Sequence, residues 1–312
     1  MRRNLTPLST PAYATVICFL IALTACKKET ELVPDNQPPD YDGVATVVTA
    51  NYVNRLFIDL IGREPLDVEM AAEVAALESA SLSQASREAL VNKLMTSTAY
   101  LEDDSSYTNK YFTRQYELCK ARCLEAASDD IVDGAISNAQ QAALADSLAG
   151  NTSGANESNL ELQRLLALKR ARTDYRDGLI GIDEVMRRMV FNSIYDVINM
   201  NSFNFINATF DNLLFRYPTQ AEFDVSYSMV DGNTAAVLFT QSGQNKSDYS
   251  GIITSTPEFW EGMVRWSYRT FLGREPSTFE TYQAMSGFQN DHDLLKVQRH
   301  ILTTDEYANI QP

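Results

Sequence analysis

Histidine and cysteine, the side chains most often used to bind transition metals, are scarce in this sequence. Its 312 residues include two histidines, His292 and His300, and four cysteines. No Cys/His cluster has the spacing of a structural zinc site, and Leu124 follows Cys123 where a c-type haem attachment needs histidine. The Gly-x-Ser-x-Gly, Walker and Rossmann glycine patterns are missing as well. We therefore expect a protein that is not an enzyme and holds neither metal nor cofactor.

Basic side chains are also few. Lysine and arginine total 26 against 41 aspartates and glutamates, a formal net charge of −15. Such a chain repels the phosphates of nucleic acids, so we expect no nucleic-acid partner. The apolar run at residues 14–22 is too short to span a bilayer comfortably.

That short run belongs to a secretory signal. Arg2 and Arg3 precede it, and small residues follow it, which is the order of a signal peptide. Residues 23–26, Leu-Thr-Ala-Cys, resemble the lipobox of bacterial lipoproteins. The resemblance implies cleavage and lipidation at Cys26, with palmitate among the acyl chains. The alternative is an ordinary signal peptide with an incidental cysteine. Without residues 1–25 the net charge becomes −17, because two arginines and no acids are lost.

The segment after Cys26 is polar, carries three prolines and lacks periodicity, so residues 26–45 are predicted to be a flexible tether. Aspartate, the inner-membrane retention signal, does not follow the cysteine. The order Lys27, Lys28, Glu29 resembles the surface-export signals of Bacteroidetes-type lipoproteins. We expect an outer-membrane, lipid-anchored protein, and both faces of that membrane, the periplasmic and the external, stay open.

An internal repeat organises the rest of the chain. Residues 53–65 (VNRLFIDLIGREP) and 264–276 (VRWSYRTFLGREP) share a Gly-Arg-Glu-Pro string, and residues 206–218 (INATFDNLLFRYP) are a weaker copy. In each copy the apolar residues fall at i, i+4, i+7 and i+8, the pattern of an amphipathic helix.

The shared string has a mechanical explanation. Glycine suits a left-handed helix cap, proline ends the helix, and the arginine can bond helix-end carbonyls or a neighbouring acid. Since Phe215 replaces the glycine in the middle copy, its cap is predicted to differ. The residues of this turn motif are Gly62, Arg63, Pro65, Arg216, Pro218, Gly273, Arg274 and Pro276.

A second helix is predicted to start after each proline. Ser277 with Glu280, and Thr219 with Glu222, have capping-box spacing. The first copy keeps Glu69 but has Leu66 at the cap, so Asp67 is expected to take over. Each unit then closes with a hydroxyl cap and an aromatic ring expected to fold onto the unit's core. The predicted caps are Ser97, Ser255 (in a box with Glu258) and Thr304, with Asn192 in a half-copy at residues 186–195.

These features predict a mainly α fold, a multi-helix bundle of about three repeat units with a helical insertion. No long alternating strand pattern is present, and residues 235–239 fit either a strand or a helix. Residues 150–154 are predicted to be a loop, and residues 160–175 one helix. The predicted segments are the signal 1–25, tether 26–45, repeat 46–104, insertion 105–202, degenerate repeat 203–262 and repeat 263–312.

The repeat resembles a helical module of unknown function in secreted bacterial proteins, with a Leu-Gly-Arg-x-Pro turn, and the helical domain of phycobilisome linkers. The first copy also resembles the start of a domain of unknown function in planctomycete cytochrome-associated proteins. These resemblances imply a helical module and no particular activity. The positions that match the planctomycete pattern are Arg55, Phe57, Asp59, Leu60, Gly62, Arg63, Pro65, Leu90, Val91, Leu94, Ser97 and Tyr100.

Other candidate site residues have a structural alternative. Cys119 and Cys123, spaced i, i+4, are either buried thiols or a strained disulfide. The segment 290–293 (Asn-Asp-His-Asp) could hold a cation but fits a turn. Trp260 and Trp266 could line a ligand groove or belong to the helical core. A glycosidase would need a carboxylate pair; the candidates are Asp103, Asp104, Asp129, Asp130, Glu64 and Glu275.

The function predicted from the sequence is a protein-binding scaffold or adaptor of a cell-envelope assembly, held to the membrane by its lipid and bound to an envelope protein. The first alternative is a surface glycan- or nutrient-binding accessory lipoprotein. The second is a hydrolase with an acidic site.

Overall fold

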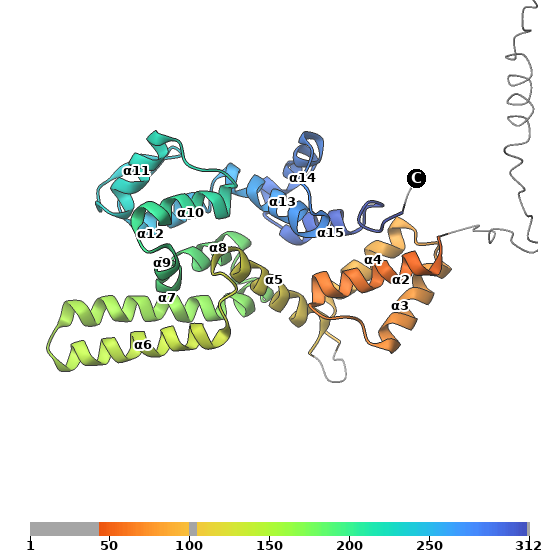
Figure 1. Ribbon diagram of the computed structural model, residues 1–312, viewed down its shortest axis with the longest axis horizontal. Helices are drawn as coiled ribbons and strands as arrows, with labels where there is room; N and C mark the ends of the chain where they lie inside the picture. The colour runs from red at the N-terminus through yellow and green to blue at the C-terminus, as the bar shows by residue number, and fades with distance from the viewer. Residues whose placement is uncertain (1–43, 100–104, 311–312) are drawn as a thin grey trace, which may run out of the picture. The chain divides into compact units, whose positions relative to one another are not determined.

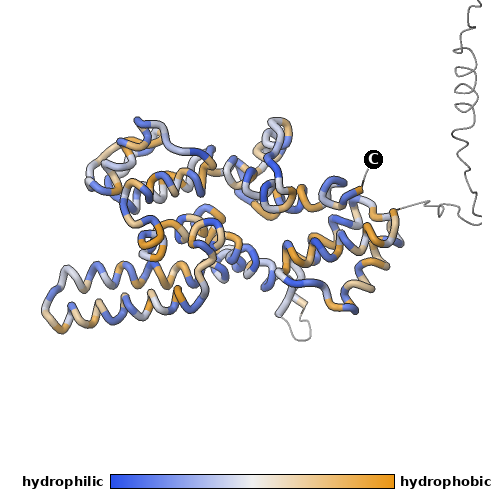
Figure 2. The backbone as a smooth tube through the Cα atoms, viewed as in Figure 1, coloured by the Kyte–Doolittle hydropathy of each residue, from blue (hydrophilic) through white to orange (hydrophobic). Residues whose placement is uncertain are grey.

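In the computed structural model, residues 44–99 and 105–310 are described, and helices dominate them (Figure 1). These residues belong to one unit by their contacts. Hydrophobic and hydrophilic positions alternate along the helices (Figure 2), as expected of amphipathic helices around a shared core. The mainly α fold predicted from the sequence is therefore confirmed. The predicted signal, Cys26, most of the tether, Tyr100, Asp103 and Asp104 lie outside the described residues.

Each predicted repeat contains three helices. In the last two units, a long first helix ends in the shared turn, and two shorter helices follow. In the first, a π-helical segment, η1, extends the initial helix. The bounds are α2 (Thr46–Leu56), η1 (Phe57–Ile61), α3 (Asp67–Ser79) and α4 (Gln84–Thr96); α10 (Ser202–Leu214), α11 (Gln220–Val230) and α12 (Lys246–Ile253); and α13 (Pro257–Leu272), α14 (Thr278–Asp291) and α15 (Leu294–Leu302).

The predicted insertion is also helical. Its helices are α5 (Tyr107–Cys123), α6 (Asp129–Leu148), α7 (Thr152–Arg176), α8 (Ile182–Val190) and α9 (Ser193–Asn199). Helices α6 and α7 form an antiparallel hairpin (Figure 1). The loop predicted at residues 150–154 is shorter than expected, because the Asn151 side chain caps α7 by accepting from the Gly154 amide at 3.1 Å.

The ambiguous segment at 235–239 is a strand. Strand β1 (Ala236–Leu238) pairs antiparallel with β2 (Gln241–Gly243), with Val237 opposite Ser242. The hairpin lies in the second unit, between α11 and α12. It is the one sheet in the part of the chain that the structure describes.

The first and last units pack against each other. The Tyr52 hydroxyl donates to the Leu302 carbonyl at 3.0 Å, and the Tyr307 hydroxyl donates to Asp59 at 2.8 Å. Tyr307 is the closing aromatic of the third unit, and its ring meets Tyr52 edge to face at 5.9 Å. It is buried as expected, and its hydroxyl and its ring both contact the first unit. Segments about 250 residues apart in sequence thus share one core, and the described C-terminal end lies beside α4 (Figure 1).

Candidate functional site

The arginine of the turn motif forms the same ion pair in all three units. Arg63 reaches Glu69 with two hydrogen bonds of 2.7 and 2.9 Å. Arg274 does the same to Glu280. The glutamate is residue N3 of the second helix, and its other bond comes from the backbone amide at the cap. The arginine thus ties the turn to the start of the next helix, one of the two roles predicted for it.

In the second and third units, the same arginine holds a further glutamate from the closing segment. Arg216 binds Glu222 and Glu258, and Arg274 binds Glu280 and Glu306. We call each set an arginine clamp. Hydrogen bonds from these arginines hold the pKa of Glu222 and of Glu280 at about 2. Ionised and paired carboxylates of this kind are poor general acids, so the clamps are structural.

In the first unit, Ala99 occupies the sequence position that corresponds to Glu258 and Glu306. The Tyr107 hydroxyl, from α5, donates to Glu69 at 2.8 Å. The inserted segment thus adds a hydrogen bond to the ion pair of the first unit.

The turn glycines have the predicted conformation, with φ of 81° at Gly62 and 67° at Gly273. In the middle copy Phe215 is also left-handed, with φ of 58°, so the prediction of a different cap is wrong for the backbone conformation. The cap does differ in its hydrogen bond, because the Gly273 amide donates to the Arg269 carbonyl and the Phe215 amide has no such bond among the described residues. The Phe215 ring lies 4.3 Å from the guanidinium of Arg122 and 4.8 Å from that of Arg269. Arg122 also donates to the Asp211 and Asn212 carbonyls at the end of α10. These contacts offset the cost of a left-handed side chain.

The capping boxes at Thr219 and Ser277 are confirmed, and Asn192 caps α9 through bonds from two backbone amides. The first copy has half a box, in which Glu69 binds the Leu66 amide and Asp67 is the first helical residue rather than the cap.

One of the three closing caps follows the prediction, and two do not. Thr304 accepts from the Tyr307 amide. The prediction of Ser97 as a helix cap is wrong, because Ser97 flanks the end of α4 and Ser106 caps α5, the next helix of the described residues. The prediction of Ser255 as a cap is wrong. Thr256 caps α13 by accepting from the Phe259 amide at 3.0 Å, because Pro257 must take the first helical position.

Both tryptophans belong to the helical core, which is the second of the two roles that the sequence allowed for them. Trp260 and Trp266 are 5% and 7% exposed. Trp260 stacks on His292 with ring centroids 3.8 Å apart, and Phe288 meets it edge to face. Neither tryptophan lines a cavity that we find among the described residues.

The remaining candidates have structural partners or surface positions. Cys119 and Cys123 are buried free thiols, and burial raises the pKa of both. Asp129 binds Lys120. Glu275 binds Arg265, and Glu64 and Asp130 are exposed. Within the described residues, no group of three potential ligands could hold a metal ion.

An open apolar groove lies where the α6–α7 hairpin meets α9. Its volume is about 770 Å³. Helix α6 supplies a stripe at helical spacing, and α9 supplies the facing wall. The stripe is Ile131, Ala135, Asn138, Ala139 and Ala142, and the wall is Ile194, Val197 and Ile198. Ile131 and Val197 remain 53% and 76% exposed, so the groove is an uncovered apolar surface.

One end of this groove is acidic. Glu125 lines it, and Asp130 lies next to Ile131 in the first turn of α6. Neither carboxylate has a hydrogen bond or ion pair within the part of the chain that the structure describes. Glu161, also in the lining, differs, because it binds Arg164 and the Ser193 amide. The groove therefore offers apolar area with free negative charge at one end.

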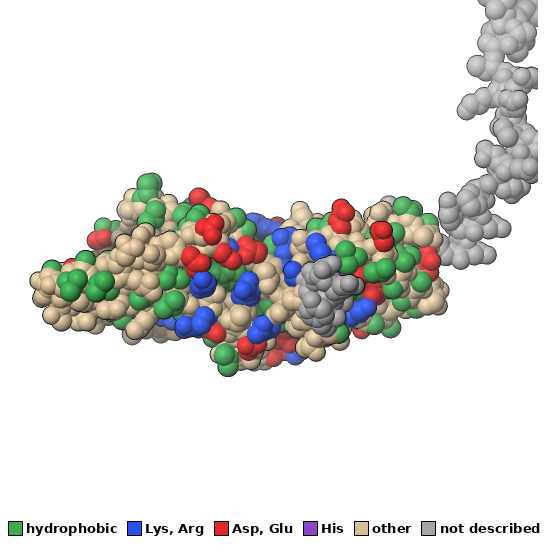
Figure 3. All heavy atoms as spheres, turned by 90° about the horizontal axis from the view of Figure 1, so that it is seen from below, with side chains coloured by type: hydrophobic (Ala, Val, Ile, Leu, Met, Phe, Trp, Pro, Cys, Tyr) green, Lys and Arg blue, Asp and Glu red, His purple; other side chains and the backbone are tan. Residues whose placement is uncertain are grey.

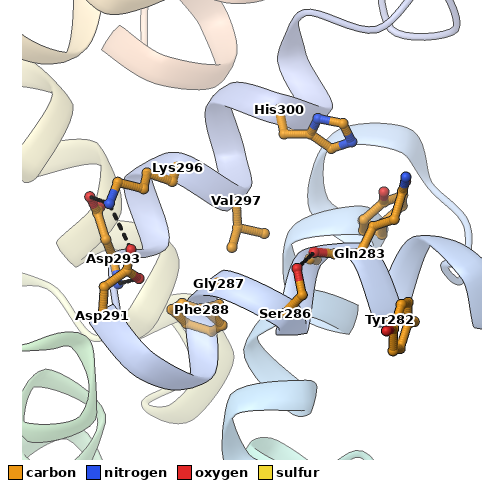
Figure 4. A pocket seen from close by; sticks show the side chains of 12 residues that line it. Tyr282, Gln283, Ser286, Gly287, Phe288, Asp291, Asp293, Lys296, Val297 and His300 are labelled. Carbon is orange, nitrogen blue, oxygen red and sulfur yellow. Dashed lines mark hydrogen bonds and ion pairs between the residues drawn. The ribbon is translucent and has the colours of Figure 1, made fainter.

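A second cavity, of about 420 Å³, lies between α14 and α15 (Figure 4). Asp291, Asp293 and Lys296 lie at one end, and Gln283 and His300 lie at the other. Phe288 and Val297 form the apolar part between them. Phe288 packs on Trp260, so this tryptophan lies one layer behind the cavity wall.

Acidic and basic side chains are mixed on the face shown in Figure 3, with no large region of one sign on that face. No helix among the described residues is long and apolar enough to cross a membrane. Comparison of the chain with protein-family models, curated proteins and solved structures finds no match.

Proposed function

We propose that this protein is a non-catalytic adaptor that docks an amphipathic helix of an envelope protein in the groove between α6 and α9. The observation that carries the proposal is the uncovered apolar stripe along α6, which faces α9 across an open groove. From Ile131 to Ala142 the stripe is about 16 Å long at 1.5 Å per residue, enough for three turns of a bound helix. Alanines along the stripe let a partner helix approach closely.

The charge at the groove's end indicates the partner's chemistry. Glu125 and Asp130 are carboxylates without a basic partner in the described residues. A lysine or arginine beside the apolar face of the bound helix would pair with them and fix its direction. The occupant is therefore an amphipathic helix with a basic residue at one end.

Anchorage at the outer membrane rests on the sequence. Lipidation of Cys26 and the polar tether would hold the helical units at the membrane surface with reach toward a partner. Metabolic labelling with an alkyne fatty acid should mark the wild-type chain and not Cys26→Ser. Equal labelling of both would remove the lipid anchor from the proposal.

The groove is tested by photo-crosslinking in intact cells, with a benzophenone amino acid at Val197. We expect a cross-link to one envelope protein, mapped to an amphipathic helix. Gly134 lies in the lining, and a side chain added there meets no atom within 4 Å. Gly134→Trp should therefore fill the groove without disturbing α6 and abolish the cross-link.

The matched control is Gln140→Trp, on an exposed part of α6 outside the groove lining. It should leave the cross-link unchanged. Glu125→Lys should weaken the cross-link by reversing the charge at the groove's end. A cross-link that survives Gly134→Trp, or none at Val197, would refute this docking site.

A further inference from the structure

The cavity between α14 and α15 is lined by polar side-chain groups that form no hydrogen bond with other described residues. Tyr268, from α13, lines it and is 2% exposed, yet its hydroxyl has no hydrogen-bond partner among the described residues. Burial raises the pKa of Tyr268 to about 12, so the hydroxyl remains protonated and able to donate. The hydroxyl is not one of the buried atoms without a partner, so it is accessible from the cavity and open to a hydrogen bond from a ligand.

Two further polar side chains line the same cavity. The Gln283 amide and the His300 imidazole have no side-chain hydrogen bond within the described part of the chain, and they lie at one end of the cavity in Figure 4. Tyr282, largely exposed, lies beside them and offers an aromatic face. The cavity thus combines donors and acceptors at one end with apolar and aromatic walls.

The charged groups of the cavity are already paired. Lys296 lies 2.6 Å from an Asp291 carboxylate oxygen and 3.6 Å from Asp293. An anionic ligand would find no free lysine or arginine in the lining, and the net charge of −15 would repel it. A purely apolar ligand would cover Tyr268, Gln283 and His300 without satisfying them, at a cost for each.

We propose that this cavity is a binding site for a neutral, hydroxyl-rich ligand, a short oligosaccharide. Its hydroxyls would bond the Tyr268 hydroxyl, the Gln283 amide and the His300 imidazole. The apolar face of a sugar ring would rest on Tyr282 or Phe288. The site is separate from the α6–α9 groove, so this proposal does not depend on the adaptor function.

Gly287 gives a variant that blocks the cavity without unfolding the protein. It lines the cavity from within α14, and a side chain added there meets no atom within 4 Å. Gly287→Leu should fill part of the cavity, and it should stabilise α14 because leucine has a higher helix propensity than glycine. Tyr268→Phe removes only the unpartnered hydroxyl. Phe279→Ala is the matched control, because Phe279 is an exposed aromatic of the same helix outside the lining.

The experiment is saturation-transfer difference NMR on the purified full chain, with short neutral hexose and pentose oligosaccharides at about 5 mM, a concentration that detects millimolar affinity. Decanoate and an acidic oligosaccharide serve as probes of the other ligand classes. Thermal melts verify that each variant folds.

We expect at least one neutral oligosaccharide to bind, with loss of its signal in Gly287→Leu and an affinity reduced about tenfold in Tyr268→Phe. Phe279→Ala should bind as the wild type does. The proposal is overturned if no neutral oligosaccharide binds, if only decanoate or the acidic probe binds, or if folded Gly287→Leu binds as well as the wild type.

Discussion

Three glycines of the last unit should respond in different ways to the same substitution, to alanine. An alanine Cβ at Gly273 or at Gly287 would meet no atom within 4 Å, so steric clashes with neighbours do not make the two substitutions differ in stability. The backbone conformations make them differ, because Gly273 has φ of 67° and Gly287 lies inside α14. At Gly262, in α13, an added Cβ would lie 2.1 Å from the Leu213 carbonyl oxygen of α10.

The magnitudes follow from these local geometries. Gly273→Ala should destabilise the fold by about 1 kcal/mol, the cost of a left-handed L-residue. Gly287→Ala should stabilise it by about 1 kcal/mol, because alanine is the better helix former. Gly262→Ala should destabilise by about 2 kcal/mol, since overpacking against backbone outweighs the helix gain.

The assay is urea unfolding followed by far-ultraviolet circular dichroism, with Gly287→Ala as the matched control for Gly273→Ala. The change in midpoint at constant slope gives the difference in free energy of unfolding. Gly273→Val, with a β-branched side chain, should lose at least as much stability as Gly273→Ala. The reasoning fails if Gly273→Ala is neutral or stabilising, or if Gly262→Ala costs nothing.

Three further outcomes are expected. Arg274 holds the pKa of Glu280 at about 2, below its ordinary 4.5, so the pair stabilises the fold above pH 4.5 and this contribution is lost as pH falls toward 2. It amounts to about 1 kcal/mol after solvent screening, and the difference between wild type and Glu280→Gln in urea midpoints should shrink over that range. Buried Cys119 and Cys123 should resist iodoacetamide at pH 8 until the chain is unfolded, as peptide mass spectrometry would measure; rapid native labelling would contradict their burial. Thr256→Ala should cost about 1 kcal/mol of unfolding free energy, whereas Ser255→Ala should cost little; the reverse order would restore Ser255 as the cap.

The errors made from the sequence have different physical causes. Ser255 and Thr256 are adjacent hydroxyl residues, and the capping-box spacing of Ser255 and Glu258 misled the choice between them, whereas Pro257 at the first helical position indicates Thr256. The left-handed Phe215 could not be foreseen, because the groups around its ring come from α5 and α13. Trp260 and Trp266 are of a residue type that often lines ligand grooves, but both are buried because helices pack over them.

The two candidate sites could not be predicted from the sequence either. The α6 stripe is mostly alanine, and nothing in its spacing reveals that α9 faces it. Tyr268 is one of fifteen tyrosines, and its unpartnered hydroxyl follows from the placement of α14 and α15 around it. Of the helix-interior glycines, Gly134 and Gly287 line cavities, whereas Gly262 packs closely against α10, so a glycine in a helix does not by itself mark a cavity.

The sequence by itself determined the local structure: the helical units, the left-handed turns at Gly62 and Gly273, and the capping boxes at Thr219 and Ser277. These depend on interactions between residues a few positions apart, and such interactions are encoded in spacing and residue type. Only the tertiary structure decided the second glutamate of each clamp, the contact between the first and last units, and both cavities. In the clamps and in the contact between units, the partners lie between about 30 and 250 residues apart, so their meeting depends on how the whole set of helices packs.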